Sequence, residues 1–519
     1  MSSAILAELE YAVSGLTNPP LWALPVTALA LIAFSYLYAH FVTHSALRGI
    51  PGPLAAKLSN VWLFSTARRG VRSRTIHDLH QRLGPLVRIQ PNHVSIVDED
   101  AVKVIYGHGS GLPKADYYDA FLTVNSRPGI FSTRSRKDHT RKRKMVSHVF
   151  SAASVRNFEP FMKGNLENFV RQWDRLCAEA GGTARFDALD WFNYLAFDMI
   201  SDLAFGRAFG MLLTGKDMAE LRETPTSPPT YTSAIEVLHH RGQVNSTVGC
   251  IPSPYKPWAR YIPDPFFRKG IAVARNAAKI AIAAVRDRLE NPPTHDREDL
   301  LARLAEARDE KGSPISRDEL TAEAMTQLIA GSDTTANSSC AMLYYAAGTP
   351  GVLEKLQAEL DDVIDEDSLP TYDAVKGLPY LDAVYKESMR IHSTVAIGLP
   401  RIVPDDSPGV TVAGHYFPPG TVLSVPIYSL HHSKDIWGDD ADTFRPERWE
   451  HATPRQNNAF MPFSTGPRGC IGRNVAEMEL KLMLAAWARR YTPVIEERMD
   501  IEEAFLNKPV SVKISLTRR

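Results

Sequence analysis

The pattern of hydrophobic and polar positions predicts a mainly helical chain with a few short strands. Residues 316–348 and 381–391 carry apolar side chains at helical spacing, whereas residues 86–97 and 510–516 are β-branched runs typical of strands. No internal repeat and no low-complexity tract long enough for a linker divides the chain. We therefore expect one large, mainly α domain with small β-sheets. Polar and Pro-rich stretches predict loops at residues 224–232, 251–265, 291–296 and 404–420.

The most apolar segment lies near the N-terminus. Residues 21–42 contain no Asp, Glu, Lys or Arg over 22 positions, which is enough for a helix to cross a hydrocarbon core of ~30 Å. A cleaved signal peptide is the main alternative, but no basic region precedes the run, and the run is longer than usual for such a peptide. A buried or interfacial helix is the second alternative, because Pro25, Ser35 and His40 weaken the hydropathy.

The charges that flank this segment predict its orientation. The first basic residue is Arg48 and more follow it, so the positive-inside rule places the N-terminus in the lumen and the body in the cytosol. Pro51 and Pro53 then form a stiff elbow that cannot continue the helix. The sequence thus predicts a lumenal segment, a single membrane anchor, a Pro/Gly elbow and a catalytic domain at residues 1–20, 21–42, 43–56 and 57–519.

Composition excludes several classes of protein. The chain has 519 residues, 44% of them hydrophobic, and its 59 basic residues balance 59 acidic ones, so a nucleic-acid-binding surface is not expected. Its 4 cysteines are far apart, without a CxxC pair or a zinc-type spacing. A disulfide framework is therefore not expected, and the body should face a reducing compartment.

Near the C-terminus, one cysteine stands in a glycine-punctuated loop with the sequence FSTGPRGCIG. A thiolate at Cys470 looks like an axial haem ligand, the ligand type that favours O–O cleavage. Gly466 and Gly472 would allow close backbone approach and free amide N–H groups for the sulfur, Phe463 would cover the proximal side, and Arg468 would pair with a propionate. The alternative is a buried free cysteine in a turn, and the fixed offsets of the other four residues argue against it.

These residues resemble the haem-ligand signature of the cytochrome P450 superfamily. The resemblance implies a mainly α fold with small β-sheets, in which one large P450-type haem domain follows an N-terminal transmembrane helix. It also implies haem b (iron protoporphyrin IX) as the cofactor, Cys470 as the metal ligand, and O2 as a co-substrate.

The middle of the long helix predicted at residues 316–348 contains weak helix formers, which suggests a functional irregularity. Ser316 begins a capping box at its start. Ala330 and Gly331 are expected to leave room for a haem face, and Thr334 to bond backward to a carbonyl. By resemblance to the superfamily's oxygen-activation motif, Asp333 and Thr334 form a catalytic proton relay. The alternative is a helix kink solvated by hydroxyl groups.

A charged network is predicted downstream. Glu387 and Arg390 stand three apart on one face of a helix, and Arg448 could bridge to Glu387. Alone such a pair says little, but the three residues correspond to the superfamily's structural triad. Buried, the network would serve the specificity of the fold rather than its stability.

Two haem propionates need cationic partners. Arg468 and Arg401 are candidates, and His139 and Arg143 lie one helical turn apart in a basic helix at residues 138–150. The superfamily usually has Trp at the position of His139, so this chain departs from the pattern there.

Electrons must come from another protein, because the chain carries no P-loop, no GxGxxG and no flavin module. The resemblance implies a membrane-bound NADPH–cytochrome reductase, a flavoprotein, and location in the endoplasmic reticulum membrane with the catalytic domain in the cytosol. Arg141, Lys142 and Lys144 are either a docking patch for this donor, which we favour, or an ordinary solvated face.

The substrate is predicted from a finer resemblance. The motifs NPPLWALP (18–25), TRKRKMVSH (140–148) and QLIAGSDTT (327–335) are similar to the fungal benzoate 4-monooxygenase branch. This implies para-hydroxylation of a small, benzoate-like aromatic acid, whose carboxylate must be paired if it enters an apolar pocket. By analogy the pocket draws on residues 117–131, 231–248, 394–399 and 505–508. Candidates for the carboxylate site are Thr123, Asn125, Ser126 and Arg241.

Other functions remain open at this stage. The chain could be a monooxygenase of another secondary metabolite, a haem-thiolate isomerase or dehydratase that needs no reductase, or a haem sensor. The intact pair of Asp333 and Thr334 argues against the isomerase, and a sensor requires neither a proton relay nor a deep substrate cavity.

Overall fold

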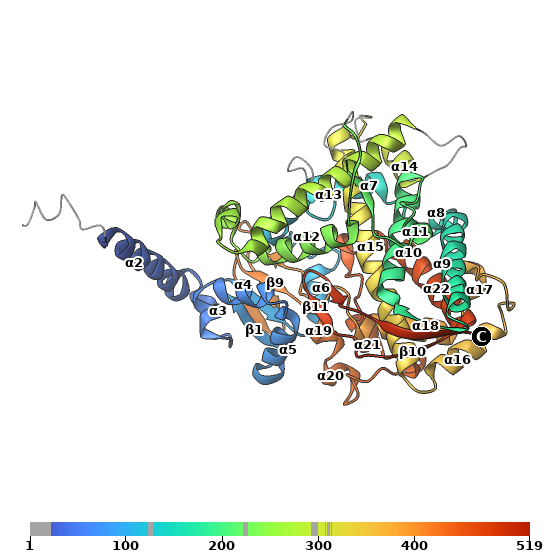
Figure 1. Cartoon of the computed structure of the whole chain (residues 1–519). Coiled ribbons are helices and arrows are strands. Elements are labelled where there is room, and N and C mark those ends of the chain that lie inside the picture. Colours follow the sequence, from blue (N-terminus) through green and yellow to red (C-terminus); the bar gives the residue numbers. More distant parts are fainter. Residues whose placement is uncertain are drawn as a thin grey trace, which may run out of the picture.

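The computed structural model describes residues 22–122, 128–221, 227–291, 299–306 and 314–519, together with residues 308 and 312. Its body is mainly helical with small sheets, and a single N-terminal helix projects away from it (Figure 1). The fold class predicted from the sequence is confirmed.

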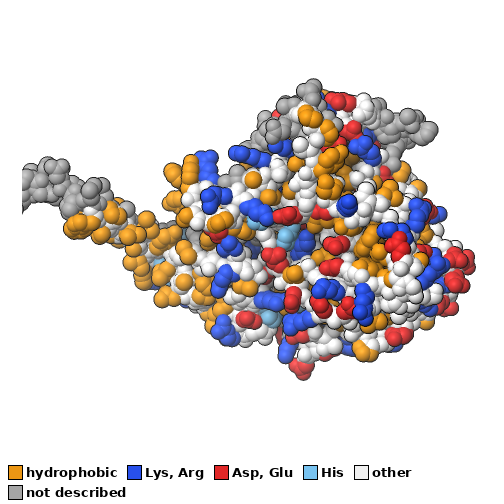
Figure 2. Space-filling model, in the orientation of Figure 1, with side chains coloured by type: hydrophobic (Ala, Val, Ile, Leu, Met, Phe, Trp, Pro, Cys, Tyr) orange, Lys and Arg blue, Asp and Glu red, His pale blue; other side chains and the backbone are white. Residues whose placement is uncertain are grey.

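The projecting helix is α2 (Ala23–Tyr38), which continues into a short π-helical turn, η1 (Ala39–Thr43). Pro25–Thr43 has a mean hydropathy of 1.6 and is, among the described residues, the one helix long and apolar enough to cross a membrane. Hydrophobic side chains cover its surface (Figure 2). Such a surface is unfavourable in water and suits contact with an apolar environment. The predicted lumenal segment at residues 1–20 lies outside the described residues.

The predicted elbow is held against the body. The amide of Arg88 donates to the carbonyl of Pro51 at 2.8 Å, and a Cβ at Gly52 would collide with the carbonyl oxygen of Arg88. Glycine is therefore required where the chain crosses strand β1. Helix α3 (Leu54–Leu58) follows at once, so helical structure begins inside the segment predicted as elbow.

Within the part of the chain that the structure describes, five small sheets flank the helices. The strands predicted at residues 86–97 form the antiparallel pair β1–β2, and the run at residues 510–516 corresponds to β13, which begins three residues later than predicted. The four-stranded sheet has the order β1 (Leu86–Gln90), β2 (His93–Ile96), β9 (Val422–Ser424) and β6 (Arg401–Ile402). A three-stranded sheet has the order β10 (Tyr491–Ile495), β13 (Lys513–Arg518) and β3 (Thr183–Asp187). The remaining sheets have two strands each. They pair β11 (Ile501–Glu503) with β12 (Asn507–Pro509), β4 (Ala219–Leu221) with β5 (Thr230–Thr232), and β7 (Val410–Val412) with β8 (His415–Phe417).

The central element is α15 (Arg317–Gly348), a helix of 32 residues that passes through the body (Figure 1). The Ser316 hydroxyl accepts the amide of Glu319 at 3.2 Å, as the predicted cap requires. The reciprocal half of the capping box is not among the contacts of the described residues, because the Glu319 carboxylate binds Arg141 and Lys142 instead. The other long helices are α9 (Glu159–Glu179), α10 (Ala188–Phe205), α12 (Ala234–Gly249), α13 (Pro265–Glu290) and α22 (Arg473–Arg490).

The main hydrophobic core lies where α9, α10, α15 and α22 pack together. A Cβ at Gly331 of α15 would lie 2.6 Å from the side chain of Ile200 on α10. The missing side chain at Gly331 therefore serves close helix packing, and its predicted role in leaving room for a haem face stays a prediction. Shorter helices complete the body: α4 (Val61–Arg68), α5 (Arg72–Leu83), α6 (Glu99–Tyr106), α7 (Arg136–Val146), α8 (Ala152–Arg156), α11 (Met211–Thr214), α14 (Leu300–Glu306), α16 (Val352–Asp361), α17 (Tyr372–Val375), α18 (Pro379–Ile391), α19 (Ile427–His431), α20 (Lys434–Trp437) and α21 (Pro454–Ala459).

Candidate active site

An internal cavity of about 320 Å³ brings together segments far apart in the sequence. One wall is the middle of α15 and another is the cysteine loop before α22. The cavity is mostly apolar and is large enough for a cofactor or a small ligand. The predicted site residues on its walls are His139, Arg143, Arg241, Ala330, Gly331, Asp333, Thr334, Phe463, Arg468, Cys470 and Gly472.

The backbone holds the cysteine loop in one conformation. The amide of Cys470 donates to the carbonyl of Phe463 at 2.9 Å, and the amide of Gly469 to that of Gly466 at 3.0 Å. Gly466 has a φ of 69°, and a Cβ there would collide with the carbonyl oxygen of Tyr106 at the end of α6. Glycine is thus required at this position by contact with α6. The prediction gave Gly466 a role toward the cofactor, but it does not line the cavity.

The Cys470 thiol lies deep among protein atoms, and the surface that it exposes faces the cavity. Burial raises the pKa of this thiol above its ordinary value, because a thiolate is poorly solvated there. The backbone N–H of Gly472 and the nearby Arg143 guanidinium act in the opposite direction. The predicted amide contact to sulfur is therefore made by Gly472.

The hydroxyl of Thr334 donates to the carbonyl of Ala330 at 2.6 Å, the backward bond that the sequence predicts. The Oδ1 atom of Asp333 is buried and has no hydrogen-bond partner among the described residues. Asp333, Thr334 and Ala330 all face the cavity. An acid and an alcohol on one helix turn are thus available to a molecule bound there.

A buried carboxyl group that was not predicted lies nearby. Glu479 of α22 accepts the hydroxyl of Thr335 at 3.2 Å, and its second oxygen has no partner among the described residues. Burial raises the pKa of Glu479 to about 8, so the side chain is largely protonated at neutral pH. Only its position nine residues after Cys470, on the helix that the cysteine loop begins, could have suggested that it reaches the cavity.

Basic side chains gather at the cavity next to the cysteine loop. Arg143 donates to the carbonyl of Gly469 at 2.7 Å and Arg468 to that of Thr133 at 2.6 Å. His139 lies on the same wall, and burial with repulsion from Arg468 lowers its pKa to about 3. No carboxylate of the described residues forms an ion pair with any of these three.

Lys114 is a fourth member of this group and was not predicted. It is buried, lines the cavity and donates to the carbonyl of Phe131. Burial, followed by repulsion from Arg401 and Arg468, lowers its pKa well below the ordinary value. Lys114 stands in an irregular segment without a sequence signal, and a single β-bridge to Arg401 brings it here.

Arg401 itself lies beside the cavity rather than on its wall. Its guanidinium donates to the Tyr118 hydroxyl at 2.9 Å and to the carbonyl of Pro400 at 3.2 Å. Arg401 therefore adds positive charge to this group of basic side chains without lining the cavity. Lys114, which does line it, is the residue in a position to meet a propionate there.

This charge pattern tests whether the cofactor implied by the sequence fits. Buried cations without anionic partners are unfavourable, so the protein alone leaves the cluster incomplete. The two propionates of a haem are anions of the required kind, and Cys470 faces the same cavity as the cluster. The donor set therefore fits a haem whose iron is ligated by sulfur.

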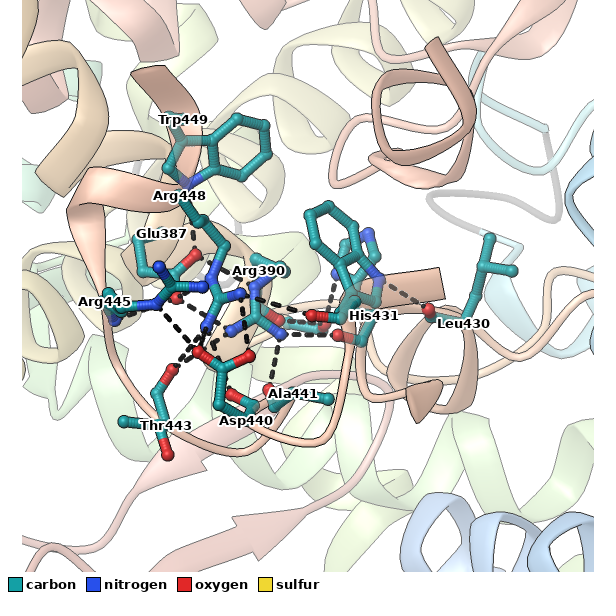
Figure 3. Close-up of polar contacts among 12 residues, drawn as sticks. Glu387, Arg390, Leu430, His431, Asp440, Ala441, Thr443, Arg445, Arg448 and Trp449 are labelled. Atoms are coloured by element: carbon teal, nitrogen blue, oxygen red, sulfur yellow. Dashed lines mark hydrogen bonds and ion pairs between the residues drawn. The ribbon is translucent and has the colours of Figure 1, made fainter. Parts of the chain in front are cut away.

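The expected bridge between Glu387 and Arg448 forms at 2.8 Å, and Arg390 binds the same carboxylate at 2.8 Å (Figure 3). Arg390 also donates to the carbonyls of His431 and Ala441, each at 2.7 Å. All three triad side chains are buried, and the network is extensively hydrogen-bonded, which is the condition for a buried charge network to be tolerated. It ties α18 to the segment that leads into the cysteine loop.

One residue of the predicted docking patch is buried and a second is partly exposed. Lys142 is 6% exposed and pairs with Glu323 at 2.9 Å, while Arg141, whose side chain is 33% exposed, pairs with Glu319 at 2.6 Å. Lys142 points inward, and both ion pairs hold α7 against α15. The sequence could not separate a solvated basic face from a buried one, because the acidic partners stand almost 180 residues away.

Three candidates for the substrate carboxylate, Thr123, Asn125 and Ser126, lie outside the described residues. The fourth, Arg241 on α12, is buried and lines the cavity. The pocket regions expected by analogy contribute Phe121, Phe131, Leu238, Thr394, Val395, Leu399 and Phe505 to the wall.

Together, the fold and the cavity define a haem-thiolate enzyme. Residues 51–516 match the family Cytochrome P450, and the chain belongs to this family, whose members carry a haem-thiolate cofactor. It is a cytochrome P450 monooxygenase.

Comparison with known proteins gives similar chains of the same kind. Benzoate 4-monooxygenase bphA of Aspergillus niger is 51% identical over 502 residues, which cover 95% of this chain and 96% of that protein. Pisatin demethylase of Fusarium vanettenii is 30% identical over 484 residues, or 92% of this chain and 89% of the relative. Cytochrome P450 monooxygenase cicH of Emericella nidulans is 30% identical over 464 residues, or 86% and 88%.

Proposed function

We propose that this monooxygenase inserts one oxygen atom from O2 into a small aromatic acid, converting benzoate to 4-hydroxybenzoate. The observation that carries the proposal is the 51% identity to a benzoate 4-monooxygenase over 95% of the chain. The cavity supports it, because aromatic side chains and a buried arginine line the same apolar space. At 30% identity, the pisatin demethylase and cicH relatives do not point to this substrate.

In this proposal, the Cys470 thiolate would hold the iron of haem b in the cavity. The haem-thiolate group supplies O2 activation when bound. The amide of Gly472 and the guanidinium of Arg143 stabilise the anionic sulfur, and Phe463 shields it from water. Arg143, Arg468 and Lys114 would hold the two propionates, and these anions would offset the repulsion among the cations.

Asp333 and Thr334 would supply protons to a molecule bound in the cavity. The free Oδ1 atom of Asp333 is a site that can hold and release a proton next to the cavity. Thr334 can turn its hydroxyl away from the carbonyl of Ala330 to donate to a bound molecule. The small side chain of Ala330, which is exposed toward the cavity, leaves space for that molecule.

We further propose that α2 anchors the enzyme in the endoplasmic reticulum membrane and that the body lies in the cytosol. The exposed apolar surface of α2 supports an anchor, and the side chain of Leu54, which is 69% exposed, continues this surface onto the body. Electrons then come from NADPH through a membrane-bound flavoprotein reductase, because the chain has no flavin or nucleotide motif of its own.

The decisive experiment uses the purified holoenzyme with reductase and NADPH. We expect benzoate to shift the haem spin state in the absorption spectrum and to yield 4-hydroxybenzoate in proportion to the NADPH consumed. Para-substituted benzoates and neutral aromatic compounds serve as comparison ligands. A spectrum and a turnover that ignore every aromatic acid, but respond to another class of compound, would contradict the substrate assignment and leave the P450 chemistry intact.

A further inference from the structure

Arg241 is a buried cation that the protein itself does not neutralise. Its side chain is 6% exposed and lines the cavity. Its one hydrogen bond within the described residues runs from Nη2 to the carbonyl of Leu122 at a long 3.4 Å. A guanidinium has five N–H donors, so most of its capacity is unused.

Arg390 gives the contrast within the same chain. It is also fully buried, but it binds both oxygens of Glu387 and the carbonyls of His431 and Ala441. Burial without such partners lowers the pKa of Arg241 to about 10. Because an unpaired buried charge is destabilising, an anion from outside the protein would complete the Arg241 environment.

The position of Arg241 in the cavity is set by α12. Leu238, Arg241 and Gly242 lie three and four residues apart on one face of this helix, and all three line the cavity. At the end of the helix, Gly249 packs against the ring of Tyr117, where a Cβ would lie 2.5 Å from the ring. This contact holds α12 against the segment that ends at Leu122, the residue whose carbonyl Arg241 reaches.

Directly beside Leu122, three aromatic rings meet in the cavity. The ring centroids of Phe121 and Phe131 are 5.5 Å apart, those of Phe121 and Phe505 5.2 Å, and those of Phe131 and Phe505 5.3 Å. All three pairs are edge-to-face, the geometry in which aromatic rings attract one another. A further ring can pack against this group in the same way.

We infer that Arg241 and the three phenylalanines form the subsite that selects an aromatic carboxylate, with the acid group on the guanidinium and the ring against Phe121, Phe131 and Phe505. This inference rests on the proposed function, and it names the residue that distinguishes an acid from a neutral aromatic compound. A carboxylate takes two parallel N–H bonds from an arginine, and an amide of the same shape cannot, so the site binds benzoate in preference to benzamide.

The test compares the dissociation constants of benzoate and benzamide, measured from the spin-state shift of the purified holoenzyme. In Arg241→Gln we expect the constant for benzoate to rise at least tenfold and that for benzamide to change less than twofold. Arg241→Lys keeps the charge and should fall between the two. Haem content and the carbon monoxide difference spectrum show that each variant is folded.

Lys508→Gln tests the competing buried cation of the pocket. Lys508 is also buried and lines the cavity, but it lies on β12. The ratio of the two constants should be unchanged in this variant. Loss of discrimination in Lys508→Gln rather than Arg241→Gln, or equal losses for both ligands in Arg241→Gln, would overturn the inference alone. A wild-type enzyme that binds no benzoate would overturn both the inference and the proposed function.

Discussion

Glu387 and Arg448, 61 residues apart in the chain, form an ion pair of 2.8 Å in which both side chains are buried. The same carboxylate binds Arg390 at 2.8 Å, and the indole N–H of Trp449 donates to its second oxygen at 3.0 Å. One acidic side chain thus balances two buried arginines and holds together α18 and the approach to the cysteine loop.

Removing this acid should destabilise the fold. Glu387→Gln removes the acidic partner of Arg390 and leaves Arg448 with Asp440 alone, at 3.2 Å, and we expect the free energy of unfolding to fall by about 3–5 kcal/mol, with loss of haem incorporation. Denaturant unfolding and haem content per protein measure the effect. Glu179→Gln, which breaks the exposed pair with Arg175, should cost less than about 1 kcal/mol. Similar losses in both variants would show that the buried network has no special role.

Replacing the proposed haem ligand should abolish oxygen activation without unfolding the chain. We expect Cys470→Ser to lose turnover and the carbon monoxide difference spectrum that is typical of a thiolate ligand, because the serine hydroxyl is not deprotonated near neutral pH. Cys177→Ser is the control, since Cys177 is buried against the carbonyl of Leu516 and far from the cavity lining. An unchanged spectrum in Cys470→Ser would remove the central residue from the mechanism.

The proposed proton relay predicts a change in coupling rather than in binding. We expect Asp333→Asn to lower turnover by about 10²-fold and Thr334→Val to consume NADPH with much less product, while the dissociation constant for benzoate changes little. Product formed per NADPH is the measurement. Ser332→Ala removes a similar hydroxyl, bonded to the carbonyl of Leu328 at 2.7 Å, but one that does not face the cavity, so its coupling should match that of the wild type.

Glu479 predicts a pH dependence of stability. Its pKa is about 8 in the folded protein against an ordinary 4.5, so between these values the folded chain keeps a proton that the unfolded chain releases. The free energy of unfolding should therefore fall as pH rises through this window, by up to about 1.4 kcal/mol per pH unit. Glu479→Gln should remove this part of the slope, whereas Glu497→Gln, at an exposed pair with Lys513, should not. Parallel slopes in all three proteins would contradict the assignment.

The inward position of Lys142 predicts a stability effect where a docking effect was expected. Lys142→Met leaves Glu323 buried without its cation, and we expect a loss of about 3–5 kcal/mol in the free energy of unfolding. The double variant with Glu323→Gln should recover much of it. The Michaelis constant for the reductase should stay within twofold of the wild type, and a large rise without a stability change would restore the docking interpretation.

Local features of the molecule were predictable where the chemistry is contained in a short segment. The loop around Cys470, the backward bond of Thr334 and the apolar helix α2 each depend on residues within one or two turns. For Gly466 and Gly331 the structure adds a reason that the sequence did not contain, because the groups that exclude a side chain there come from α6 and α10. The presence of glycine at these two positions marked a close contact, but the contact itself is made by packing against other helices.

By itself, the sequence determined which side chain is the candidate iron ligand, where the polar turn of the long helix lies and which segment suits a membrane. These features follow from residue types at short spacing. Only the tertiary structure decided which charges are buried and which are paired. Lys142 meets Glu323 from a distant helix, whereas Lys114 and Arg241 face the cavity with no acid among the described residues to balance them. The electrostatic free energy of a side chain depends on neighbours that folding brings together, and a pattern along the chain does not contain them.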